Sequence, residues 1–152
     1  MMNDMFKREL TKCQIHSRLE PLGLSNSSRL RPDGVTQVPW SRGRVLAWDF
    51  TCAHTLCASY MRTTGGQVGE AARLAETKKL HKYSDLSSVL FTPIAMETLG
   101  VPGPAARDFI KELCRRQCDA LGDPRATSQL WQRISLQLQR GNARCVFETF
   151  SD

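Results

Sequence analysis

Two acidic residues and a group of lysines have the types and the spacing that phosphodiester hydrolysis needs. Asp33 follows a proline at the start of an apolar run, and Asp49 lies inside a second apolar run. Lys79 and Lys82 lie further along the chain, at the end of a long helical pattern. Carboxylates collect Mg²⁺, and a lysine stabilises negative charge or orients an attacking water. Together these residues predict a metal-dependent phosphodiesterase site.

Asp49 is the residue whose position most needs an explanation. The run from Val45 to Thr51 is apolar on both faces of a strand, which is typical of a strand in the interior of a sheet. A carboxylate there is costly unless it is paired or binds a metal ion. Two interpretations remain open: a metal ligand, or a buried structural acid paired with an arginine such as Arg31.

The register of a predicted hairpin brings the two acids together. Residues 34–40 and 44–52 form the predicted strands, which turn through residues 41–43. In a hairpin that is symmetric about Ser41, Asp33 lies opposite Asp49, with Cβ atoms about 5 Å apart. A turn centred one or two residues later separates them by up to ~10 Å along the strands. A bend at Pro32 or a bulge is then required to reunite them.

The remaining elements follow from hydrophobic periodicity. Helical spacing predicts helices over residues 3–17, 67–89, 104–121 and 127–140, and residues 91–97 form a third predicted strand. Gly141 and Asn142 are typical of a helix end and are expected to stop the last helix. The order helix, strand, strand, helix, strand, helix, helix predicts an α/β fold with one mixed sheet flanked by helices.

Length and composition limit the class of protein. A chain of 152 residues predicts a single domain over residues 1–152. The net charge of +6 favours a polyanionic partner, although a scattered surplus of charge serves solubility equally well. No apolar run reaches transmembrane length, and residues 1–10 have no apolar core of a signal peptide, so we expect an intracellular protein, nuclear or cytoplasmic, without a membrane partner.

The six cysteines are expected to be reduced thiols. The most metal-like spacing is that of Cys52, His54 and Cys57, and a second pair, Cys114 and Cys118, lies one helical turn apart. Neither group has the spacing of known zinc modules, so buried or unused thiols are favoured over structural zinc.

Several short motifs together resemble a known domain. It is the C-terminal restriction-like endonuclease domain attached to the reverse transcriptases of non-LTR retrotransposons. The resemblance covers residues 3–147 and implies a PD-(D/E)XK nuclease core, which cuts DNA with Mg²⁺ or Mn²⁺ so that the nicked strand primes reverse transcription. The motifs that carry it are Arg31-Pro32-Asp33-Gly34, Trp48-Asp49-Phe50-Thr51, and residues 75–83, 93–100 and 139–142.

The resemblance assigns roles to three acids. Asp33 corresponds to the acid of the Pro-Asp motif, and Asp49 corresponds to the second acid. Glu20, which follows the first predicted helix, resembles the acid that often completes the metal site. The resemblance therefore implies that these three carboxylates hold the catalytic metal ion.

The lysine of the family motif is displaced in this chain. The usual position is two residues after the second acid, where this chain has Thr51. In this type of domain the lysine moves to the following helix, where Lys79 and Lys82 lie one turn apart and can both face the site. Four further basic residues are expected to contact the nucleic acid: Arg31, Arg42, Arg44 and Lys78.

Alternatives remain for each part of this assignment. The lysines also fit the solvated face of an amphipathic helix. Glu97, at the end of a predicted strand, fits either a site role or hydrogen bonds with backbone amides. The whole chain fits an active nuclease or an inactive nucleic-acid-binding relic. We expect a detached or fragmentary domain, with a reverse transcriptase module of a parent polyprotein as a partner.

Overall fold

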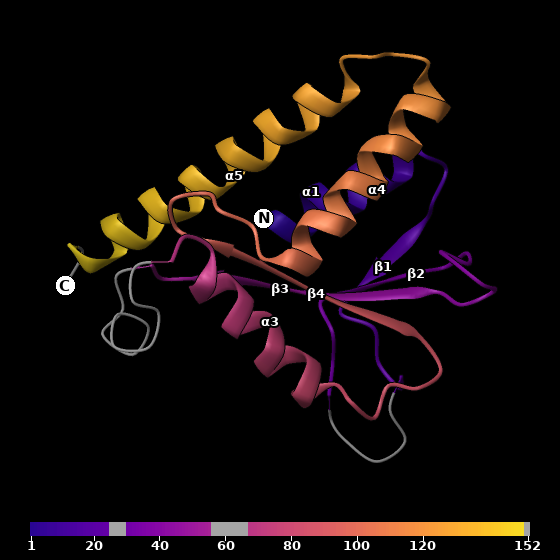
Figure 1. Ribbon diagram of the computed structural model, residues 1–152, viewed down its shortest axis with the longest axis horizontal. Coiled ribbons are helices and arrows are strands. Elements are labelled where there is room, and N and C mark those ends of the chain that lie inside the picture. The colour runs from indigo at the N-terminus through magenta and orange to yellow at the C-terminus, as the bar shows by residue number, and fades with distance from the viewer. Residues whose placement is uncertain (25–29, 56–66, 151–152) are drawn as a thin grey trace.

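The protein is an α/β structure in which a mixed sheet carries helices on both faces (Figure 1). The computed structural model describes residues 1–24, 30–55 and 67–150. In that part of the chain, four strands lie in the order β1-β2-β3-β4; the first two pairings are antiparallel and β3 runs parallel to β4. The strands are β1 (Ser17–Leu19), β2 (Gly34–Thr36), β3 (Leu46–Ala53) and β4 (Leu90–Glu97), and the helices are α1 (Met2–Lys12), α3 (Glu70–Lys82), α4 (Pro104–Leu121) and α5 (Ala126–Thr149).

Two apolar layers separate the helices from the sheet. Helices α1, α4 and α5 lie on one face, where Leu46 and Trp48 of β3 join the larger core. Helix α3 lies on the other face, where Ala47 joins a smaller cluster with Tyr83. Side chains alternate along a strand, so β3 contributes to both layers. The predicted α/β class with a mixed sheet and flanking helices is confirmed.

The hairpin between β2 and β3 has the register that opposes the two acids. Gly34 pairs with Trp48 and Val35 pairs with Ala47, as expected for a hairpin symmetric about Ser41. The turn itself is centred later, because Ser41 bridges Arg44. From Gly34 to Ser41 the first arm has seven residue steps, whereas the second arm has four from Arg44 to Trp48. The irregular segment after Thr36 accommodates the three extra residues.

Helix α1 is shorter than the pattern predicted, because the chain turns into an unpredicted strand. The predicted helix over residues 3–17 is wrong at its end, since α1 stops at Lys12. Gln14 follows with a φ of 60°, and Ser17 to Leu19 then pair with β2 as strand β1. A strand of three residues is too short to show alternation, so periodicity could not reveal it.

Helices α3 and α5 also differ from their predicted bounds. Helix α3 begins at Glu70, so Val68 is not part of its inward stripe and is 83% exposed. Helix α5 continues through Gly141 and Asn142 to Thr149, so the predicted stop is wrong. The Asn142 side chain does not cap the helix but donates a 2.7 Å hydrogen bond to the Thr98 carbonyl.

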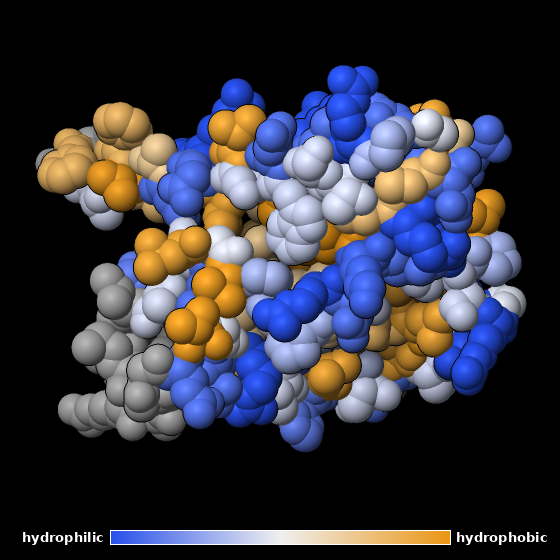
Figure 2. Space-filling view, turned by 45° about the horizontal axis from the view of Figure 1, so that its top comes forward, coloured by the Kyte–Doolittle hydropathy of each residue, from blue (hydrophilic) through white to orange (hydrophobic). Residues whose placement is uncertain are grey.

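The end of α5 projects from the body of the molecule. Its last turns form the arm at the left of Figure 2, where the surface is apolar and includes the exposed Val146 and Phe147. Within the described residues, no helix combines the length and the apolar character needed to cross a membrane.

Candidate functional site

Asp49 is buried in the middle of β3, on the face that α3 covers. Only 4% of its surface is exposed. The alternation of β3 explains its direction, because Trp48 enters the larger core and Asp49 therefore faces the other side of the sheet. The sequence-based expectation of a buried acid in a sheet strand is confirmed. The side chains that bind the Asp49 carboxylate offset the cost of burying its charge.

Lys79 of α3 and Tyr83, the residue that caps the end of this helix, bind the two oxygens of Asp49. The Lys79 ammonium donates a 2.7 Å hydrogen bond to Oδ1. The Tyr83 hydroxyl donates a 2.5 Å hydrogen bond to Oδ2. Residues four apart share one helix face, so α3 presents both groups to the same carboxylate. Asp49 is thus paired with Lys79 and Tyr83, and not with Arg31.

Tyr83 is held as a neutral hydroxyl. Burial raises the pKa of the Tyr83 phenol, and the hydrogen bond to Asp49 and the negative charges of Asp49 and Asp33 raise it further. The carbonyl of Arg31 lies 3.0 Å from the same hydroxyl as a second acceptor. A phenol has one proton, so the shorter bond to Asp49 takes it. The negative charges of Asp49 and Asp33 therefore both favour the protonated form of Tyr83.

Asp33 lies directly before β2 and next to Asp49 in the register. Extending the pairing of Gly34 with Trp48 by one residue places Asp33 opposite Asp49. The Oδ2 atom of Asp33 accepts a 2.7 Å hydrogen bond from the backbone N–H of Phe50. Its Oδ1 atom makes no hydrogen bond with any residue that the structure describes. With respect to the described residues, Asp33 therefore keeps one oxygen available to a ligand beside the buried pair.

Glu20 lies beside Asp33 but points elsewhere. Its backbone N–H donates a 2.8 Å hydrogen bond to the Asp33 carbonyl, and both residues line a hollow of about 320 Å³ with Asp4. The Glu20 side chain is exposed and forms an ion pair with Arg31. Among residues 1–24, 30–55 and 67–150, no three His, Cys, Asp or Glu side chains are grouped so that they could hold a metal ion.

The other predicted site residues lie around this centre in different ways. The Lys82 ammonium is exposed and lies 5.0 Å from the centroid of the Tyr83 ring, with no ion pair to either acid. Lys78 is exposed on the same helix. Arg42 and Arg44 are exposed in the turn between β2 and β3. Arg44 is five residue steps from Asp49, about 16 Å along a strand. The two arginines therefore lie at the turn of the hairpin, away from Asp49.

Tyr83 is a site residue to which the sequence analysis gave no role. It follows Lys82 in the motif and lies four residues after Lys79. The i, i+4 spacing already places it on the same helix face as Lys79. That spacing is the signal from which its position beside Asp49 could have been predicted.

Two further buried acids have structural partners. Glu97 accepts a 3.2 Å hydrogen bond from the N–H of Ala71 at the start of α3, which is the backbone alternative for this residue. Glu76 of α3 accepts hydrogen bonds of 2.9 and 2.8 Å from the N–H groups of Ala105 and Ala106, at the start of α4. Both carboxylates satisfy donors that a helix start leaves unpaired.

The cysteines do not form a metal site in the described residues. Cys52 is exposed at the end of β3, and partial burial raises the pKa of its thiol. Cys57 lies outside the described residues, so its part of the predicted spacing is not described.

Comparisons with known proteins leave the class of the chain at the level of its fold. No protein-family model matches the chain, and no curated protein matches it either. The structure defines an α/β protein with a four-stranded mixed sheet. The restriction-endonuclease-like core and the retrotransposon origin stay expectations that rest on the motifs.

The donor chemistry of Asp33 and Asp49 fits a hard divalent cation. Mg²⁺ takes oxygen ligands and is commonly held by one or two carboxylates together with water and substrate phosphate. Asp33 has one oxygen without a partner among the described residues, and Asp49 uses each of its oxygens for one protein hydrogen bond. A carboxylate oxygen has two lone pairs, so both residues keep capacity for a metal ligand bond.

Proposed function

We propose that this chain is a metal-dependent DNA endonuclease domain of the restriction-endonuclease-like type, derived from a non-LTR retrotransposon. Its role would be to nick target DNA and so provide a primer for reverse transcription. The observation that carries this proposal is the bond between Lys79 of α3 and Asp49 of β3. A cation from the following helix is what the motif requires when the strand position two residues after the acid is Thr51.

The residues divide the work of hydrolysis between them. Asp33 and Asp49 would hold Mg²⁺ or Mn²⁺, and a bound metal ion supplies an activated water and neutralises charge on the scissile phosphate. Lys79 supplies a positive charge where negative charge develops on the phosphate. Tyr83 fixes the orientation of Asp49 through its hydrogen bond. Glu20 is joined to Asp33 through its backbone N–H, and its carboxylate pairs with Arg31, so a metal-binding role for Glu20 would require that ion pair to open.

A second function, binding of nucleic acid without cleavage, has its own support. Both oxygens of Asp49 already have protein partners, and no three acidic side chains converge in the described residues. A relic of a nuclease would keep this closed arrangement together with the net positive charge. Both functions predict DNA binding that weakens with salt, and only the first predicts cleavage.

Nicking of a supercoiled plasmid separates the two functions. We expect the wild-type protein to produce nicked circles with Mg²⁺ or Mn²⁺ and to stop when EDTA is added. Asp33→Asn and Asp49→Asn should each abolish nicking, because each removes one negative charge and keeps the shape of the side chain. Asp85→Asn is the matched control, since Asp85 is exposed and its side chain makes no hydrogen bond or ion pair with any described residue. Nicking that persists in EDTA or in Asp49→Asn contradicts the proposal.

A further inference from the structure

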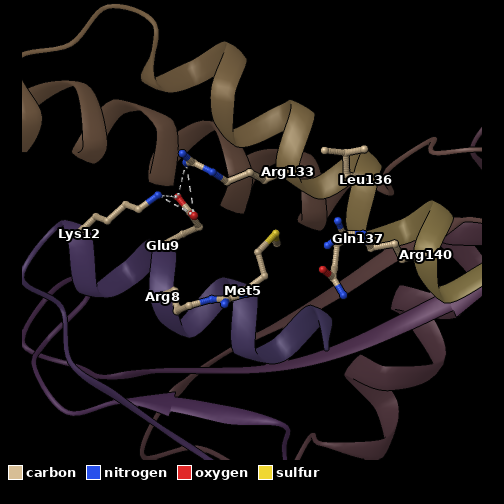
Figure 3. Close-up of a pocket in the computed structure, with 8 residues that line it drawn as sticks. All are labelled: Met5, Arg8, Glu9, Lys12, Arg133, Leu136, Gln137 and Arg140. Carbon is tan, nitrogen blue, oxygen red and sulfur yellow. Dashed lines mark hydrogen bonds and ion pairs between the residues drawn. The ribbon is translucent and has the colours of Figure 1, made fainter.

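A cavity of about 340 Å³ opens between α1 and α5, in the helical layer on the face of the sheet opposite α3 (Figure 3). Arg8 and Lys12 enter it from α1, and Arg133 and Arg140 enter it from α5. Its apolar lining comes from Met5 and Leu136. This cavity is separate from the Asp49 site, because Asp49 faces α3.

One carboxylate lies among these cations, and it is already neutralised. Glu9 is 3% exposed and forms ion pairs with Lys12 at 2.8 Å and with Arg133 at 3.3 Å. Gln117 of α4 donates a further 2.8 Å hydrogen bond to it. This network joins three helices and accounts for two of the cations. The lining still has a surplus of positive charge, because it holds four cations and one acid.

Arg8 and Arg140 are the cations that this network does not use. Both are exposed, and neither makes a hydrogen bond or ion pair with any described residue. The positive charge of Arg8 helps to lower the pKa of the Asp4 carboxyl, but no hydrogen bond joins the two side chains. An arginine presents five N–H donors in a planar fork that matches phosphate oxygens. Two arginines at the rim of a basic cavity, both without partners in the part of the chain that the structure describes, are therefore available to an external anion.

The positive charge is spread along the groove rather than gathered at one point. Arg133 and Arg140 are seven residues apart on α5, a rise of about 10 Å. Arg8 and Lys12 are four residues apart on α1, a rise of about 6 Å. The spacing suits successive phosphates of an extended chain.

An apolar hollow of about 480 Å³ adjoins the basic cavity along α5, and Leu136 lines both. Its wall includes the half-buried Trp131 together with Ser135 and Gln139. At 100° per residue, Trp131 lies about half a turn from Arg140 around α5, and Leu136 lies between the two hollows on the outer side of the helix. An occupant of both hollows must therefore cross α5 over Leu136. A flexible single strand can do so, with phosphates on the cations and a base on the aromatic ring.

We infer that the α1–α5 cavity and the adjoining Trp131 hollow form a binding site for single-stranded nucleic acid. Phosphates lie against Arg8 and Arg140, and a base packs on Trp131. The inference stands on this cavity alone and does not depend on cleavage at Asp49. A duplex is not favoured, because its stacked bases cannot reach Trp131.

Fluorescence anisotropy of a labelled single-stranded oligothymidylate, measured in EDTA, tests the site. We expect Arg8→Gln/Arg140→Gln to weaken binding about tenfold or more and to reduce the slope of log K against log salt by about 1.4. Trp131→Leu, which keeps an apolar side chain against the core, should weaken binding about tenfold. Arg107→Gln/Lys111→Gln removes the same charge from exposed positions of α4 and should change the affinity less than about threefold.

Three results would overturn the inference. They are equal losses in the two double variants, undiminished binding by Arg8→Gln/Arg140→Gln, or competition by inorganic phosphate at the same phosphate concentration as the oligonucleotide. The last would indicate a site for free phosphate. Thermal unfolding of each variant shows that it is folded. Loss of plasmid nicking in Asp49→Asn, with oligothymidylate binding unchanged, separates this site from the nuclease site.

Discussion

The hydroxyl of Tyr83 and the carboxylate of Asp49 share a 2.5 Å hydrogen bond across the interface between α3 and β3. Oxygen–oxygen bonds to an ionised acceptor are short and strong, so this contact fixes where the carboxylate points. It also joins the two segments that carry the motif, because Tyr83 directly follows α3 as its cap residue and Asp49 lies in the middle of the sheet. The geometry of the candidate site is therefore inseparable from the packing of α3.

Ionisation of Tyr83 should require a higher pH than that of an ordinary tyrosine. Burial and the two neighbouring acids raise the pKa of its phenol above the usual 10.0. A raised pKa in the folded state means that the stabilising contribution is complete below about pH 10 and is lost as the pH rises further. In a Tyr60→Phe variant, ultraviolet absorbance of tyrosinate should report Tyr83 alone. An ordinary titration in that variant would contradict the arrangement.

Magnesium should stabilise the wild-type protein if Asp33 and Asp49 hold it. At a magnesium concentration about tenfold above the dissociation constant, the unfolding midpoint should rise by about 3 to 5 °C. Asp33→Asn and Asp49→Asn should remove that shift, and Asp85→Asn should keep it. Differential scanning calorimetry with and without Mg²⁺ measures all four proteins. Equal shifts in all of them would show that magnesium binds elsewhere.

The three lysines of α3 should differ in their effect on cleavage. Lys79→Ala removes the cation bound to Asp49 and should reduce the nicking rate on the order of a hundredfold. Lys78→Ala removes an exposed charge and should have little effect. Lys82→Ala should be intermediate, because its ammonium lies over the Tyr83 ring and not on an acid.

The DNA affinity of these lysine variants is the control. Each variant loses one positive charge, so the three should bind DNA with similar affinity at the same salt concentration. Small and equal losses of nicking at all three positions would show a solvated basic face, and Lys79 would then have no role in catalysis.

Much of this arrangement is readable from the sequence, because the helix and strand periods are strong around it. The register that opposes Asp33 and Asp49, the strand that buries Asp49 and the helix that carries Lys79 were all predicted, and the structure has the predicted register. The sequence could not show which lysine meets the acid. Lys79 and Lys82 share a helical stripe, and the structure places Lys79 on Asp49 and Lys82 over the Tyr83 ring.

Other features depended on tertiary contacts that no local pattern contains. Strand β1 exists because Ser17 to Leu19 pair with β2. Helix α5 continues past Gly141, and Asn142 bonds the Thr98 carbonyl of another segment instead of capping the helix. The basic cavity needs two helices from opposite ends of the chain, so Arg8 and Arg140 have no sequence signal that connects them.

Gly34, the residue after Asp33, should tolerate no side chain. It pairs with Trp48, and a Cβ atom there would overlap the carbons of the Trp48 indole. Trp48 is fully buried in the larger core and cannot move aside without repacking its neighbours. Overpacking of a core costs about 1 to 3 kcal/mol, and occasionally more, so Gly34→Ala should lose about 3 kcal/mol of unfolding free energy, at the upper end of that range. The Gly34 in the motif is thus explained by packing rather than by a turn.

Gly141→Ala is the matched control for that prediction. Gly141 lies inside α5, and the nearest atom to an added Cβ is a Met1 methyl carbon at 3.9 Å. Alanine stabilises a helix interior relative to glycine, so this variant should gain about 0.5 to 1 kcal/mol. Urea unfolding of both variants measures the two changes with one method. If Gly34→Ala unfolds at the same urea concentration as the wild type, Trp48 does not cover Gly34 and the pairing of β2 with β3 must differ from this register.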